Sequence, residues 1–63
     1  MNASQFARWL KARGVEVISK KGTGHRRLVN PANGRRSEMP WHGGSKQLKP
    51  GLMAKIRKDL GLE

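Results

Sequence analysis

The sequence predicts a small α+β fold in which two helices flank three strands in the order α-β-β-β-α. Three observations support this prediction. Apolar residues recur at helical spacing near both ends of the 63-residue chain, β-branched residues alternate with polar ones between them, and glycine- or proline-containing turns separate the alternating segments. Because the connections are short, we expect a three-stranded antiparallel sheet with both helices on one face, which leaves the other face to solvent or ligand.

The first helix is expected from about Ala3 to Arg13. Three apolar residues share one face at helical spacing: Phe6, Trp9 and Leu10. Either Asn2 or Ser4 can cap the start, because both side chains can accept a hydrogen bond from a free backbone N–H. Gly14 is typical of the residue that follows a helix. For Trp9, the spacing favours core packing over the alternative of base stacking.

Three strands are predicted in the middle of the chain. The first spans Val15 to Lys20, where β-branched residues alternate with polar ones. The second runs from His25 to Asn30, and the third runs from Arg35 to Met39, where Pro40 stops it. The connection at 31–34 contains Asn-Gly, a strong signal for a tight turn between antiparallel strands.

Side chains of the second strand alternate between the two faces of the sheet. One face receives His25, Arg27 and Val29, and the other receives Arg26 and Leu28. We expect the face of Arg26 and Leu28 to pack against the helices, and His25 to lie on the open face.

A second helix is predicted to begin at Pro50, whose fixed φ suits the first helical position, and to end before Gly61. Its apolar stripe consists of Leu52, Met53, Ile56 and Leu60. Lys55 and Lys58 fall on the outer face, where phosphate contact and ordinary solvation are both open interpretations. Together the elements outline a double-stranded-RNA-binding-like fold, formed by one domain over residues 1–63.

The composition is strongly basic, with 14 lysines and arginines against four acidic residues and a net charge of +10. Such a charge favours a polyanion, a membrane surface or an acidic protein as partner, and we expect nucleic acid. The chain has no cysteine, no apolar run near the roughly 20 residues of a membrane span, and no signal-peptide core. A cytoplasmic protein that does not associate with membranes is therefore expected.

The basic turn from Lys20 to Arg27 is the stretch that points to chemistry. Histidine exchanges protons near neutral pH, so His25 can take a proton from an RNA 2′-hydroxyl or give one to the departing 5′-oxygen. Glycines in the same turn let a phosphate backbone approach closely. A histidine at a strand end is also a common surface residue, so residue type alone leaves both interpretations open.

The residues expected to bind RNA surround His25 in the turn and along the neighbouring strands. They are Lys20, Lys21, Gly22, Thr23, Gly24, Arg26, Arg27, Arg35, Arg36 and His42. We expect strand pairing to bring the arginine pairs 26–27 and 35–36 toward each other, in a patch that gives affinity with little base specificity. His42 can bind phosphate, orient its loop or form an acid–base pair with His25. The alternative is a histidine that only hydrogen-bonds its own loop.

Metal and cofactor chemistry has little support in the sequence. The two histidines and four acidic residues form no recognisable ligand cluster, and no pair of carboxylates falls in a motif for two-metal catalysis. No phosphate-binding loop of the nucleotide-hydrolase kind is present. We expect neither a metal nor a cofactor. Histidine chemistry of this kind would discriminate RNA from DNA, which lacks the 2′-hydroxyl.

Four segments resemble the HicA family of toxins, the mRNA interferase halves of HicA–HicB toxin–antitoxin systems. They are Gly22–His25, Asn33–Arg36, Met39–Gly44 and Leu48–Leu52. The resemblance runs nearly end to end, as far as Gly61. It implies a double-stranded-RNA-binding-like fold and RNA cleavage without a metal by one essential histidine. That histidine would be His25, with Thr23 where serine is usual. It also implies a HicB-like antitoxin that covers the toxin and blocks the histidine.

Two residues depart from the family pattern. Arg26 lies where members often carry an apolar residue, and it can snorkel at the sheet edge. Glu38 places a negative charge on a strand that should carry part of the basic patch. The leading hypothesis is an endoribonuclease toxin. One alternative is a non-catalytic RNA-binding module of the same fold, and another is an interaction domain for an acidic protein.

Overall fold

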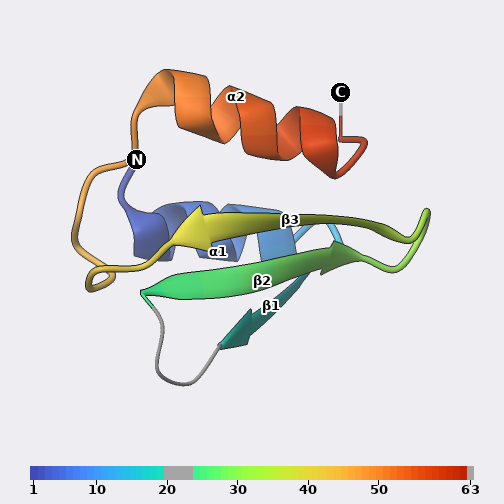
Figure 1. Ribbon diagram of the computed structural model, residues 1–63, viewed down its shortest axis with the longest axis horizontal. Coiled ribbons are helices and arrows are strands. Elements are labelled where there is room, and N and C mark those ends of the chain that lie inside the picture. Colours follow the sequence, from blue (N-terminus) through green and yellow to red (C-terminus); the bar gives the residue numbers. More distant parts are fainter. Residues whose placement is uncertain (20–23, 63) are drawn as a thin grey trace.

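The computed structural model describes residues 1–19 and 24–62 and has the predicted element order α-β-β-β-α. The elements follow one another along the chain as drawn in Figure 1: α1 (Ala3–Lys11), β1 (Glu16–Ser19), β2 (His25–Asn30), β3 (Arg35–Pro40) and α2 (Pro50–Asp59). Within the part of the chain that the structure describes, no helix has the length and apolar character that crossing a membrane requires.

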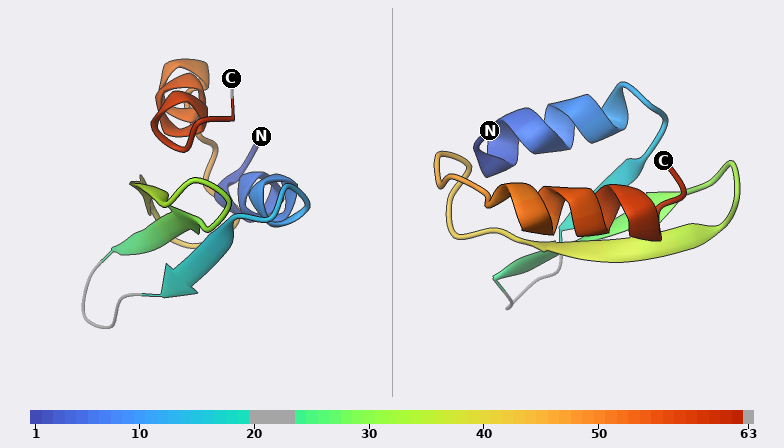
Figure 2. Two further views of the ribbon diagram at one scale, coloured as in Figure 1. Left: turned by 90° about the vertical axis from the view of Figure 1, so that its right-hand side faces the viewer. Right: turned by 90° about the horizontal axis from the view of Figure 1, so that it is seen from above.

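The three strands form an antiparallel sheet in the order β1-β2-β3, so β1 and β3 are its two edges. α1 packs beside β1 and α2 beside β3. Figure 2 shows both helices on one side of the sheet, and no described element covers the other side. The predicted layering is therefore confirmed, and the sheet presents one open face.

The core lies between the helices and the inner face of the sheet. Its largest fully buried side chains come from four of the five elements and from the residue after α2: Phe6, Leu10, Leu28, Met39, Ile56 and Leu60. Trp9 is half-buried against this core and stacks on Phe6 with 5.8 Å between ring centroids. Its indole also lies under the Arg13 guanidinium, 3.6 Å from the ring centroid. Trp9 is thus a packing residue, as its spacing predicts.

The ends of α1 show why it begins and stops where it does. Asn2, not Ser4, caps the start, and Gln5 completes a capping box with it. The helix ends at Lys11, two residues before the predicted end. There Gly14, at φ 84°, allows its own N–H to reach the carbonyl of Lys11 and the next N–H to reach that of Leu10. These two hydrogen bonds end the helix and turn the chain toward β1, two residues before the end that the apolar spacing predicts.

Two strand bounds also differ from the prediction. β1 starts at Glu16, one residue later than expected, and the expected end at Lys20 lies outside the described residues. β3 includes Pro40, which pairs with His25, although proline was expected to stop the strand. The reason is that β3 is an edge strand, where a residue without an N–H can still be accommodated.

The loop from Trp41 to Lys49 returns to the start of α1 instead of projecting into solvent. Its carbonyl groups at Gly44 and Lys46 accept hydrogen bonds from the N–H groups of Ser4 and Ala3, at 2.9 and 3.0 Å. Free N–H groups at a helix start need such acceptors. The loop, the end of β3 and the start of both helices therefore form one connected region.

Candidate active site

His25 is the first residue of β2 and is exposed on the open face of the sheet. Residues directly opposite in antiparallel strands share a face, so the register defines its surroundings. His25 pairs with Pro40 on the neighbouring strand β3, and the next residue of β2 on the same face is Arg27. The predicted alternation is confirmed, since Leu28 is buried while His25 and Arg27 are exposed.

Gly24, Trp41 and His42 form a tight junction beside His25. The N–H of Trp41 donates to the carbonyl of Gly24 at 2.6 Å. The His42 ring lies so close to Gly24 that a Cβ there would be 2.9 Å from its Cε1 and 3.2 Å from its Nδ1. The structure therefore places His42 against the residue that precedes His25, and the ring in this position leaves no room for a side chain at position 24.

Arg26 lies on the opposite face from His25 and Arg27. Its side chain is half-buried, and its guanidinium lies over the Trp41 ring at 3.9 Å from the centroid. This contact explains how a charged residue is accommodated on the packed face, because a cation is attracted to the face of an indole. Arg26 thus helps to hold the loop that carries His42.

The expected approach of the two arginine pairs is confirmed only in part. The register pairs Arg26 with Met39 and Asn30 with Arg35, so Arg26 and Arg35 lie far apart along the hairpin. Arg35 donates from Nε to the backbone carbonyl of Asp59 at 2.9 Å and thus closes the end of α2. Arg36 shares the open face with Arg27, as a diagonal neighbour.

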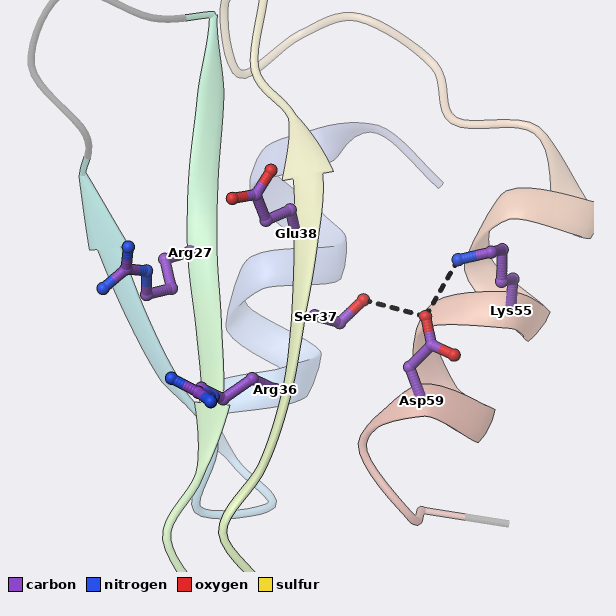
Figure 3. Close-up of a pocket in the computed structure, with 6 residues that line it drawn as sticks. All are labelled: Arg27, Arg36, Ser37, Glu38, Lys55 and Asp59. Carbon is purple, nitrogen blue, oxygen red and sulfur yellow. Dashed lines mark hydrogen bonds and ion pairs between the residues drawn. The ribbon is translucent and has the colours of Figure 1, made fainter.

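The open face carries both signs of charge. Arg27 is paired directly with Glu38 on one side and with Ile18 on the other. Both arginines of this face, together with Ser37, Glu38, Lys55 and Asp59, line an open hollow along the β3 edge (Figure 3). Acidic residues in the hollow oppose the attraction that its arginines exert on phosphate, so it is not a uniformly basic groove.

Asp59 links the hollow to α2. Its Oδ2 accepts hydrogen bonds from Lys55 Nζ at 3.0 Å and from Ser37 Oγ at 3.2 Å, as drawn in Figure 3. The hydrogen bond from Lys55 is the largest influence, and together with that from Ser37 it lowers the pKa of Asp59 below its ordinary value. The carboxylate therefore stays ionised and tied to the helix near neutral pH.

Four of the residues expected to bind RNA, Lys20, Lys21, Gly22 and Thr23, lie outside the described residues. The structure gathers Gly24, His25, Arg27 and His42 at one end of the sheet. It separates Arg26, on the inner face, and Arg35, at the far end, from them.

Sequence reasoning missed Lys46 and Lys49, which line a pocket together with His42. They lie on the loop that folds back onto α1, and their proximity depends on that return. The sequence signal was an apolar residue, Leu48, between two lysines. Burial of Leu48 attaches the loop to the core and leaves both lysines exposed. Among residues 1–19 and 24–62, no three potential metal ligands lie close enough together to hold an ion.

These features define a small basic α+β protein with a histidine at one end of its sheet and a second histidine packed against the glycine that precedes it. Residues 3–62 match the family described as HicA toxin of bacterial toxin–antitoxin. The chain belongs to this family.

Curated relatives cover the whole chain. This chain is 47% identical to "Probable mRNA interferase HicA 1" of Photorhabdus laumondii over 62 residues, and the alignment covers 98% of this chain and 100% of that protein. It is 42% identical to "Probable mRNA interferase toxin HicA" of Escherichia coli K12, with 98% of each chain covered. "Probable mRNA interferase HicA" of Pseudomonas fluorescens is 41% identical over 63 residues, which is 100% of this chain and 98% of that protein. No solved structure gives a significant match.

Proposed function

We propose that this protein is the toxin of a toxin–antitoxin pair and that it cleaves RNA with His25 as the proton-transfer group. The observation that carries the proposal is the position of His25, exposed at the start of β2 beside Gly24 and His42. The names of the relatives, which describe probable mRNA interferases, support RNA as the substrate.

The proposed reaction is attack of a ribose 2′-oxygen on the adjacent phosphorus. His25 takes the 2′-hydroxyl proton as the bond to phosphorus forms, or supplies a proton to the 5′-oxygen as its bond to phosphorus breaks, and water exchanges the other proton. Either role gives a 2′,3′-cyclic phosphate and a 5′-hydroxyl. Cationic side chains nearby, such as Arg27, can offset the charge on the pentavalent phosphorus. No metal ion is required in this scheme.

We propose that His42 acts in this site through its contact with Gly24. The contact fixes the loop against the strand on which His25 begins, and the ring is exposed and can also meet a phosphate. The proposal therefore assigns His25 the proton transfer, and assigns His42 the positioning of the strand end and a contact to RNA.

The proposed protein partner is a HicB-like antitoxin that covers the histidine in the cytoplasm. The charge of +10 suits an acidic partner, and binding would add burial that a 63-residue chain cannot supply itself. Mass action then makes the toxin more stable when the partner is present.

The test is incubation of purified protein with matched labelled single-stranded RNA and DNA, with and without a chelator. We expect cleavage of the RNA alone, unchanged by the chelator, with 2′,3′-cyclic phosphate ends. RNA that is bound in a salt-dependent manner and stays intact would favour the alternative of a non-catalytic RNA-binding module. Cleavage that the chelator stops would contradict the metal-independent scheme.

A further inference from the structure

A second concave feature lies next to the proposed active site, in the region where the β3–α2 loop meets α1. This loop pocket has a volume of about 210 Å³. Its apolar walls include Pro40, Leu48 and Leu52, and its exposed polar side chains include His42, Lys46 and Lys49. It is smaller than the roughly 300–1,000 Å³ of sites for drug-sized ligands, so it suits a single ring system.

The charge around the loop pocket distinguishes it from the hollow on the β3 edge. Glu38 and Asp59 line that hollow, whereas none of the described residues that line the loop pocket is acidic. Lys46 and Lys49 are exposed on the two sides of the buried Leu48. Apolar walls flanked by amines complement a flat, weakly polar group that is joined to phosphates.

His42 connects the loop pocket to the proposed active site. The same imidazole that lines the pocket lies against Gly24, the residue before His25. A ligand group in the pocket would therefore be separated from the catalytic strand end by one aromatic ring. Histidine is among the side chains on which unstacked RNA bases stack.

We propose that the loop pocket binds one nucleobase of the RNA, next to the nucleotide that is cut. The inference rests on the proposed function and adds a subsite to it. Pro40, Leu48 and Leu52 contact the base, the His42 ring stacks on it, and the two lysines contact its flanking phosphates. The pocket thus holds one nucleotide of the RNA at a fixed position beside the cut, which the mixed charge of the open sheet face does not do.

The test is a binding experiment with the cleavage-deficient His25→Ala protein and short single-stranded RNAs in which one base at a time is removed. We expect loss of one particular base to weaken binding about tenfold, in the range of a stacked base. Leu52→Phe, which fills the pocket, should abolish this position dependence. A flat series, or a series that Leu52→Phe leaves unchanged, would overturn the proposal.

A second pair of variants keeps the test independent of how well Leu52→Phe folds. Replacing both pocket lysines, Lys46→Ala with Lys49→Ala, should weaken RNA binding more than Arg8→Ala with Lys11→Ala, which removes the same charge from exposed positions of α1. Equal weakening would contradict the proposal. So would variants that bind RNA normally and lose only antitoxin binding, since the pocket would then hold a protein side chain. Failure of the nuclease assignment would instead appear as native protein that binds RNA without cutting it.

Discussion

At the scale of single residues, the site depends on how closely Gly24 and His42 approach each other. The space for a side chain at position 24 is occupied by the imidazole of His42. Because His42 is exposed, it can move aside if that space is filled, and the fold does not depend on its position. The contact therefore offers a way to disturb the site without unfolding the protein.

Gly24→Ala should displace the His42 ring and slow RNA cleavage by between about 10- and 100-fold, the range expected for misplacing a group near the reaction. Stability should change little. The control is Gly51→Ala in α2, where a new Cβ meets nothing within 4 Å. It should leave cleavage unchanged and keep or slightly raise stability, since alanine favours helix. Equal cleavage rates in both variants would contradict a role for the contact.

Removal of Arg27, on the open face of the hairpin, and removal of Arg35, on its inner face, should affect different properties. Arg27→Ala removes a cation beside His25, so RNA affinity should fall and the salt slope should decrease by about 0.7, the value for one phosphate contact on a single strand. Arg35 donates to the Asp59 carbonyl instead, so Arg35→Ala should lower stability and leave the slope unchanged. Fluorescence titration of RNA over a salt series measures both slopes.

Asp59 gives the protein a pH-dependent contribution to stability. Hydrogen bonds from Lys55 and Ser37 lower its pKa in the folded state below the ordinary 3.8. A lowered folded pKa stabilises the protein above 3.8, and the contribution is lost as the pH falls through the lower value. The free energy of unfolding should therefore differ between the native protein and Asp59→Asn by a constant amount at about pH 5 to 7, because the carboxylate is ionised there in both the folded and the unfolded state. This difference should shrink below pH 3.8. Urea unfolding at each pH measures it, and a difference that widens on acidification would contradict the assignment.

At the scale of elements, the β2–β3 turn closes the end of α2. Asn30 is buried and donates from Nδ2 to the carbonyl of Leu60 at 2.8 Å, and Asn33 donates to the same oxygen at 3.1 Å. Gly61, at φ 71°, lets the chain turn away while the carbonyl of Leu60 stays capped. One hairpin turn thus fixes the position of α2 over β3.

Asn30→Ala should destabilise the protein by about 1–3 kcal/mol, because it removes a buried amide that donates to the carbonyl of Leu60 and accepts from the N–H of Ala32. Asn33→Ala is the matched control, since this side chain is exposed and water can replace it. Its cost should be clearly smaller. Urea unfolding of the two variants measures the difference, and equal losses would show that Asn30 is not the principal cap.

Much of this arrangement follows from local pattern. The alternation in β2 places His25 and Leu28 on the correct faces, and Gly14 and Gly61 mark the helix ends, because these signals depend on neighbouring residues alone. The hairpin register was also available from the turn at 31–34, which pairs Asn30 with Arg35 and so keeps Arg26 apart from Arg35. The loop pocket was not, because it depends on the return of Lys46 to the N–H of Ala3, a contact between distant segments.

At the scale of the whole molecule, one face of the sheet builds the core and the other is open, which is the face where we propose that RNA binds. Both helices cover the inner face, and the loop before α2 brings His42, Lys46 and Lys49 around the end of the sheet at which His25 lies. The positive charge is spread over the molecule, while the groups proposed to act on RNA are concentrated at this end. In the proposed function, charge therefore attracts the substrate and the sheet end holds the nucleotide that is cut.

The most direct test of the central claim is the cleavage rate of His25→Ala beside that of the native protein, with circular dichroism to establish that both are folded. Loss of a positioned acid or base is expected to lower the rate by roughly 10²–10⁴-fold while RNA binding persists. A folded His25→Ala protein that cuts RNA at the native rate would contradict the account.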